Sequence, residues 1–244
     1  MKEKADYEPY IRQRREIMDI KSITDTYLKT NQISQENMGS FKNGTVEHGY
    51  RFYHVVQQTY NNRRLLSSTV ATYYHNILAR QCIANNVILI CSVVMPTHTH
   101  EILYADDVDS ISKARGVTCR SVTCAAKKEM RERGFAIPVR ILERFPGYIP
   151  IKDRRQLLVT LKYISDNDLY LRKDGLKAPY SCFNFWRKNY YKSYCIEVLE
   201  SLFEMDISKI MNILDSNRKE VIRFADKFNS PEYQEKDKII FRRQ

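Results

Sequence analysis

The chain has 244 residues, and its 40 Lys and Arg residues outnumber its 29 Asp and Glu residues, for a formal net charge of +11. A hydrophobic fraction of 43% is ordinary for a globular protein, and the length allows one sizeable domain with extensions. No run of 18 apolar residues and no apolar leader is present, so we expect neither a membrane span nor a secretory signal. A chain this basic commonly meets a polyanion, and nucleic acid is the first candidate.

The cysteine pattern argues against a structural zinc site and against a disulfide framework. No two cysteines have the Cys-x-x-Cys spacing of zinc ligands. Without a secretory signal, reduced thiols in a cytoplasmic protein fit better than disulfides. The six cysteines are Cys82, Cys91, Cys119, Cys124, Cys182 and Cys195.

Residues 1–48 are expected to form an N-terminal helical extension. Between Tyr10 and Tyr27, isoleucines recur at helical spacing, and three arginines stand near the start of the segment. A basic helix of this kind is either a solvated face or a surface that contacts phosphates, and the sequence leaves both readings open.

Residues 49–175 are expected to form the central domain. Alternation and helical spacing predict, in chain order, strand 50–58, a basic turn at 61–64, helix 69–85, strand 86–95, a returning strand that begins near residue 98, helix 106–133 with a break near Gly116, strand 137–142, a turn at 144–148, and helix 154–166 capped by Asp153. This order fits an α+β, ferredoxin-like antiparallel sheet with helices on one face.

Residues 176–244 are expected to form a C-terminal helical extension. Three segments carry an apolar face at helical spacing, and they cover residues 190–203, 207–214 and 217–228. The predicted architecture is therefore a central sheet domain with helical extensions at both ends.

A histidine pair follows the most apolar stretch of the chain. The run from Asn86 to Met95 predicts a buried strand, and Pro96 predicts a turn after it. On the returning strand, His98 and His100 are two residues apart, so both imidazoles lie on one face while Thr99 faces away. Two neutral imidazoles on a rigid strand can chelate one divalent cation. The alternative is a pair of histidines that are satisfied by ordinary hydrogen bonds.

A tyrosine and an asparagine share one flank of the helix that begins near residue 154. Leu157, Leu161 and Ile164 form its apolar stripe, at about 100° per residue. Tyr163 and Asn167 lie one turn apart beside this stripe, so both can point toward the sheet.

These motifs resemble the HUH single-tyrosine transposases, which include insertion-sequence transposases and REP-associated tyrosine transposases. Met95-Pro96-Thr97-His98-Thr99-His100 is similar to the Met-Pro-Asn-His-x-His signature of the family. Tyr163-Ile164-Ser165-Asp166-Asn167 is similar to its Tyr-Ile-x-x-Asn pattern. The resemblance covers about residues 49–170. Two departures are Thr97, where the family usually has Asn, and Asp168, where many relatives have Pro.

The resemblance implies a site and a reaction. Tyr163 would attack single-stranded or hairpin DNA to give a 5′-phosphotyrosine and a free 3′-OH. His98, His100 and Asn167 would hold Mg²⁺ or Mn²⁺, and Asn167 would bind the ion through its amide oxygen. The site would form within one chain or across a homodimer, in a cytoplasmic, nucleoid-associated protein.

Basic side chains near these elements are expected to follow the DNA backbone. The candidates are Arg63, Arg64, Lys127, Lys128, Arg131, Arg154 and Arg155.

Two other functional hypotheses stay open at the level of the sequence. One is a domesticated protein that binds a DNA sequence or hairpin without cleaving it. The other is a structural or RNA-binding protein whose His-x-His pattern is incidental. Close approach of Tyr163 to the two histidines would favour the enzyme over the non-cleaving DNA-binding protein. The structural or RNA-binding protein would show no effect of divalent metal on DNA binding.

Overall fold

The structure is a computed structural model that describes residues 47–173, 180–181 and 194–243. The predicted helix 10–27 and Cys182 lie outside these residues. Within them, the strands are β1 (Phe52–Gln58), β2 (Ile88–Val94), β3 (His98–Tyr104), β4 (Gly147–Ile151) and β5 (Tyr180–Ser181). The helices are η2 (Tyr60–Asn62), α3 (Ser68–Ala84), α4 (Val108–Glu132), α5 (Arg154–Lys173), α7 (Tyr194–Phe203), α8 (Ile207–Asp215), α9 (Arg218–Ala225), η3 (Asp226–Asn229) and α10 (Pro231–Phe241).

The described strands form one antiparallel sheet in the order β4-β1-β3-β2-β5. The sequence β1-α3-β2-β3-α4-β4 with this strand order is the ferredoxin-like arrangement, which confirms the predicted fold class. β3 lies in the middle of the sheet, between β1 and β2. Any residue of β3 therefore has a neighbouring strand on both sides.

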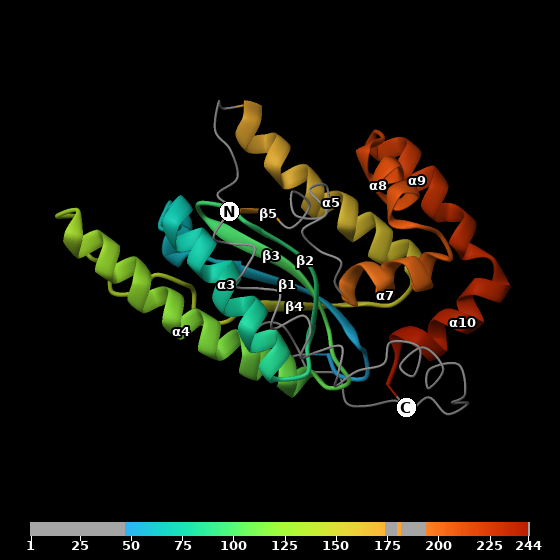
Figure 1. The fold of residues 1–244 in the computed structure, drawn as a ribbon, viewed down its shortest axis with the longest axis horizontal. Helices are drawn as coiled ribbons and strands as arrows, with labels where there is room; N and C mark the ends of the chain where they lie inside the picture. Colours follow the sequence, from blue (N-terminus) through green and yellow to red (C-terminus); the bar gives the residue numbers. More distant parts are fainter. Residues whose placement is uncertain (1–46, 174–179, 182–193, 244) are drawn as a thin grey trace.

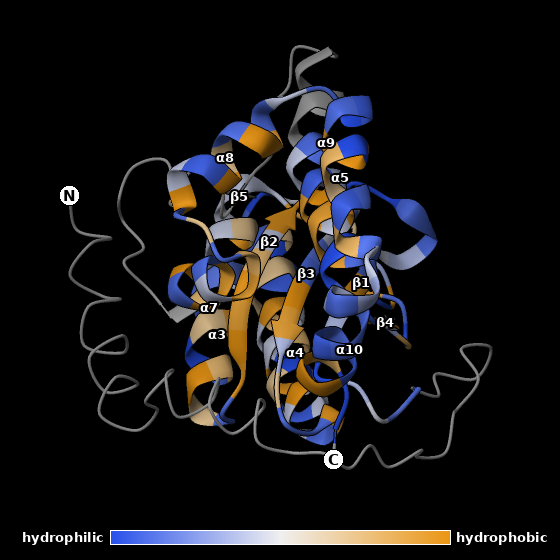
Figure 2. Ribbon diagram, turned by 90° about the vertical axis from the view of Figure 1, so that its right-hand side faces the viewer, coloured by the Kyte–Doolittle hydropathy of each residue, from blue (hydrophilic) through white to orange (hydrophobic). Residues whose placement is uncertain are grey.

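Helices cover both faces of the sheet, as Figure 1 shows. The crossover helices α3 and α4 lie on one face, as predicted, while α5 and the C-terminal helices lie on the other. β2 is buried along all seven of its residues, and most of it is coloured hydrophobic in Figure 2. A strand that is apolar on both faces is the pattern expected where helices pack on each side of a sheet.

Helix α4 runs without interruption from Val108 to Glu132, so the predicted break near Gly116 is wrong. Asp107 caps its N-terminus by accepting a hydrogen bond from the backbone N–H of Ser110. Ile111, Ala114 and Val122 bury one face against the sheet and α3. This packing outweighs the cost of about 1 kcal/mol for a glycine inside a helix.

The fourth strand is displaced from its predicted position. The expected strand 137–142 is a loop that forms a single bridge, from Leu142 to Thr59, and Val139 is 84% exposed. The strand is instead formed by Gly147–Ile151, within and after the segment predicted as a turn. Pro150 is tolerated there because β4 is an edge strand, where a missing N–H donor costs no ladder bond on the open side.

The C-terminal helices α7, α8 and α9 match the three predicted segments within the described residues, and α10 was not predicted. The side chain of Arg154, at the start of α5, is buried and pairs with Asp237 of α10. Its Nε also donates to the backbone carbonyl of Leu202, in the last turn of α7, which packs on the sheet. Arg154 therefore ties α5 to two of the C-terminal helices.

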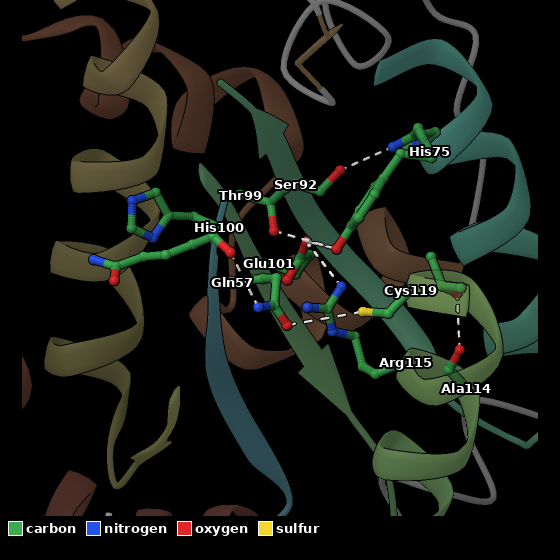
Figure 3. A network of polar contacts seen from close by, with 12 residues as sticks. Gln57, His75, Ser92, Thr99, His100, Glu101, Ala114, Arg115 and Cys119 are labelled. Atoms are coloured by element: carbon green, nitrogen blue, oxygen red, sulfur yellow. Dashed lines mark hydrogen bonds and ion pairs between the residues drawn. The ribbon is translucent and has the colours of Figure 1, made fainter. Parts of the chain in front are cut away.

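A buried polar network lies between the sheet and helices α3 and α4 (Figure 3). Tyr74 donates to Glu101 Oε1 at 2.7 Å, and the Arg115 guanidinium lies 3.5 Å from the same oxygen. Thr99 faces this network, as the period-two argument predicted, and its hydroxyl is 3.2 Å from that of Tyr74. The odd-numbered positions of β3 thus point toward α3 and α4, which leaves His98 and His100 for the opposite face.

Among the described residues, no helix has both the length and the apolar character needed to cross a bilayer.

Candidate active site

Three histidines gather on the face of the sheet that α5 covers. His98 and His100 come from β3, and their ring centroids are 4.9 Å apart. His54 comes from β1, and its ring centroid lies 5.1 Å from that of His100. Figure 3 shows the side chain of His100 on one side of the sheet, pointing away from the Glu101 network on the other side. The predicted common face of His98 and His100 is confirmed, and His54 extends it.

Helix α5 brings Tyr163 and Asn167 to these histidines. Leu157, Leu161 and Ile164 are fully buried, which confirms the predicted apolar stripe. The Tyr163 hydroxyl lies 3.4 Å from Nε2 of His100, within one chain. Tyr163 is 40% exposed, so its ring touches the histidines while remaining open to a ligand.

Asn167 closes the other side of the cluster. Its side chain is buried, and its Nδ2 donates to the backbone carbonyl of Tyr163 at 2.9 Å. Asn167 also acts on His98, whose pKa it raises against the effect of burial. Because α5 continues past Asn167 to Lys173, the presence of Asp168 in place of proline does not end the helix at the site.

The histidines of the cluster are held in their neutral form. Burial, together with smaller contributions from the neighbouring His54 and His98, lowers the pKa of His100 to about 3. Burial lowers the pKa of His54 to about 4 and also lowers the pKa of His98, against which Asn167 acts. A neutral imidazole keeps a lone pair that can bind a metal or accept a hydrogen bond.

The donor set fits a divalent cation with open coordination positions. Within the described residues, no group of three or more His, Cys, Asp or Glu side chains is arranged to hold a metal ion. The candidate ligands are two neutral imidazoles and one amide, and Nδ2 of Asn167 is already used in a bond to the backbone. The amide oxygen of Asn167 is the atom of this side chain that could bind a cation.

The local backbone holds the turn before His98 in place. The carbonyl of Thr97 accepts hydrogen bonds from the backbone N–H and the hydroxyl of Thr59, at the end of β1. The Thr97 hydroxyl is 2.9 Å from Nδ1 of His98. Thr97, which departs from the family pattern, therefore contributes to the position of the first histidine.

The two strand histidines lie in the middle of the sheet, because β3 is a central strand, and His100 is only 4% exposed because α5 covers it. His54 was missed altogether. The signal available in the sequence was its place in the alternating first strand, on the same parity as the apolar Phe52.

The predicted DNA-binding residues differ in exposure and in their partners. Arg63, Arg64, Lys128 and Arg131 are exposed, and Lys127 is half-buried and donates to the carbonyl of Val139. Arg155 is half-buried and pairs with Asp226. The assignment of Arg154 is wrong, since its guanidinium is buried against Asp237 and Leu202 and cannot reach a nucleic acid.

Two of the solved structures that are similar to this chain are described as transposases. One is a candidate transposase from Deinococcus radiodurans R1, with 18% identity, a TM-score of 0.36, and coverage of 54% of this chain and 97% of that one. The other is a REP-associated tyrosine transposase bound to a REP hairpin, with 14% identity, a TM-score of 0.40, and coverage of 59% and 83%. No family model and no curated protein matches the chain. At these levels of similarity, the function has to be argued from the site itself.

Proposed function

We propose that the protein is a DNA transposase that cleaves and rejoins single-stranded DNA through a covalent bond to Tyr163. The observation that supports this most directly is the 3.4 Å approach of the Tyr163 hydroxyl to Nε2 of His100. A nucleophile, two neutral imidazoles and a buried amide meet on one face of the sheet, in the order and spacing of the sequence motifs. An incidental His-x-His pattern would not require a tyrosine and an asparagine from a distant helix to converge on it.

In the proposed step, the Tyr163 oxygen attacks the phosphorus of a phosphodiester, and the bond from phosphorus to the 3′ oxygen breaks. The phenol gives its proton to solvent and the departing 3′ oxygen takes one up, which leaves a 5′-phosphotyrosine and a 3′-OH. The covalent bond conserves the phosphoester, so another 3′-OH can reverse the step without ATP. Phenols are mostly protonated at neutral pH, and the phosphate is negatively charged, so the site has to supply positive charge.

The proposed cofactor is Mg²⁺ or Mn²⁺, which would be held by His98, His100 and the amide oxygen of Asn167 and would neutralise charge on the phosphate oxygens. The chain's own residues position this centre. Asn167 is held by its bond to the backbone of Tyr163, and His98 is held by Thr97. The nucleophile and a candidate ligand therefore move as one piece of α5.

The proposed substrate is single-stranded or hairpin DNA. The net charge of +11 favours a polyanion, and Arg63 and Arg64 are exposed after the end of β1. The half-exposed Tyr163 is open enough to meet a phosphate, which a buried tyrosine would not be.

The test is the formation of a covalent protein–DNA adduct. The purified protein is incubated with Mn²⁺ and a labelled single strand that carries a hairpin, and the adduct is detected by denaturing electrophoresis. Tyr163→Phe is expected to abolish the adduct because it removes the attacking oxygen, while DNA binding stays within about threefold of wild type because distributed basic side chains supply the affinity. Tyr73→Phe, at an equally exposed tyrosine on α3, is the matched control and is expected to retain the adduct.

An adduct that persists in Tyr163→Phe would show that another residue is the nucleophile. DNA binding by the wild type with no adduct under any divalent metal would instead support the non-cleaving DNA-binding protein.

A further inference from the structure

His54 makes a contact that the proposed reaction does not require of it. Its Nε2 lies 3.0 Å from Nδ1 of His100, and both side chains are buried. In the strand pairing, Val56 is directly opposite His100 and His54 is opposite Ile102, so the two histidines are diagonal neighbours on adjacent central strands. The contact is therefore set by the register of the sheet and not by a flexible loop.

Only two arrangements of protons are compatible with a hydrogen bond between two neutral imidazoles. If Nδ1 of His100 carries the proton, it donates to His54 and leaves a lone pair on Nε2. If Nε2 of His54 carries the proton, it donates a hydrogen bond to Nδ1 of His100. The ring proton of His100 is then on Nε2. The second arrangement blocks Nε2 toward a metal ion.

The other contact of His100 is compatible with the first arrangement. The Tyr163 hydroxyl approaches Nε2 at 3.4 Å and can donate its proton to a lone pair there. His98 has a parallel arrangement, because the Thr97 hydroxyl is 2.9 Å from its Nδ1. Each of the two imidazoles thus has a side-chain partner on Nδ1, which orients Nε2 toward the α5 side of the site.

We propose that His54 is a positioning residue that holds His100 in the tautomer protonated on Nδ1, with the lone pair of Nε2 directed toward Tyr163 and the metal position. The benefit of this tautomer for metal binding and cleavage rests on the proposed function. The tautomer itself can be measured without DNA, metal or cleavage. A hydrogen-bond partner on the second ring nitrogen is what fixes the tautomer and orientation of a ligating histidine.

The first experiment is NMR of the metal-free protein labelled with ¹⁵N only at histidine. With five histidines in the chain, the ring nitrogens can be assigned by single substitutions. In the wild type, His100 is expected to be protonated at Nδ1 and unprotonated at Nε2. His54→Leu is expected to remove this preference, and His54→Gln, whose amide oxygen can accept the same bond, is expected to retain most of it.

The second experiment measures Mn²⁺ binding to the same proteins by electron paramagnetic resonance. His54→Leu is expected to weaken binding about 10- to 100-fold, the usual effect of removing such a partner, and His54→Gln to recover much of the loss. His75→Asn is the matched control, because His75 is also buried but bonds Ser92 on the opposite face of the sheet. It is expected to leave Mn²⁺ binding unchanged.

A wild-type His100 that carries its proton on Nε2 would overturn the proposal, whatever the variants do. So would an unchanged tautomer and unchanged Mn²⁺ affinity in a folded His54→Leu protein. The expected tautomer in a protein that forms no DNA adduct would contradict the proposed reaction but leave the role of His54 intact. The two inferences therefore fail separately.

Discussion

His98 and His100 lie on one face of β3 but differ in their surroundings. His100 is packed beneath Tyr163 and beside His54, whereas His98 lies at the first position of the strand and keeps part of its surface exposed. The two imidazoles are therefore equivalent as candidate ligands but unequal as parts of the core.

We predict that His100→Ala alone nearly eliminates adduct formation, to below about 1% of wild type, and that adding His98→Ala costs little more. One imidazole leaves an incomplete chelate, so cleavage is already lost in the single variant and the second substitution has little activity left to remove. DNA binding is expected to survive in both proteins. Adduct yield and DNA affinity, measured on the single and double variants, give the comparison, and additive losses would show that the histidines act independently.

The same variants are expected to differ in stability. His100→Ala leaves a gap in the core and should lower the free energy of unfolding by about 2–4 kcal/mol. His98→Ala should cost less than about 1 kcal/mol because its ring is partly exposed. Urea unfolding measures both values, and equal costs would mean that the burial of His100 contributes nothing to folding.

At the scale of the elements, α5 has two functions along its length. Its first residue, Arg154, binds α10 and the end of α7, while Tyr163 and Asn167 lie more than two turns further on. Attachment of the C-terminal helices and placement of the proposed nucleophile are thus carried by one helix.

We predict that Arg154→Ala lowers the free energy of unfolding by about 3–5 kcal/mol, because it leaves the buried Asp237 without its partner. The adjacent Arg155 is the matched control. Its pair with Asp226 is partly exposed on both sides, so Arg155→Ala should cost at most about 1 kcal/mol. Chemical denaturation of both variants gives the comparison, and similar costs would show that the buried pair adds nothing beyond a surface pair.

We predict that the double substitution Arg63→Ala with Arg64→Ala weakens single-stranded DNA binding and lowers its dependence on salt. Each phosphate contact contributes about 0.7 to the slope of log K against log salt concentration, so two lost contacts lower it by about 1.4. Fluorescence anisotropy over a range of salt concentrations measures the slope. Lys236→Ala is the control, since its charge is already paired with Glu232 on α10. An unchanged slope in the double variant would place the DNA elsewhere on the surface.

Local sequence patterns predicted the elements that carry the candidate site. The features that they missed, His54 and strand β4, depend on pairing between strands that are distant in the sequence. Period two on a strand and about 100° per residue on a helix predict that His98 shares a face with His100 and that Tyr163 shares a flank with Asn167. Their assignment to one site came from the resemblance of the two motifs. The role of His54 depends on the register of β1 against β3, which no local window contains. Strand β4 was misplaced because Gly147 and Pro150 argue against a strand locally, and only its edge position makes them acceptable.

The whole molecule is expected to lose stability in mild acid. Burial lowers the pKa of His75 from 6.5 to about 3, so between these values the unfolded chain binds a proton that the folded protein does not. Its contribution to stability is complete above pH 6.5 and is lost as the pH falls through this window, at about 1.4 kcal/mol per pH unit.

We predict that His75→Asn, which can still reach Ser92, reduces the pH dependence of the free energy of unfolding by about 1.4 kcal/mol per unit between pH 6 and pH 4. Urea unfolding at a series of pH values measures this slope. His48→Asn, at a partly exposed histidine, controls for the replacement of a histidine outside the core. Identical slopes in wild type and His75→Asn would mean that His75 is not the source of the acid sensitivity.

The end of α10 meets the beginning of β1. Tyr50 bridges Arg242, the N–H of Arg51 donates to the carbonyl of Phe241, and the side chain of Arg51 reaches Ile239, which is 188 positions away in the sequence. Such a contact closes a very long loop, so its entropic cost is recovered only after the intervening helices have docked. During synthesis, the contacts of Tyr50 and Arg51 with the end of α10 therefore form late, after the helices between them have docked.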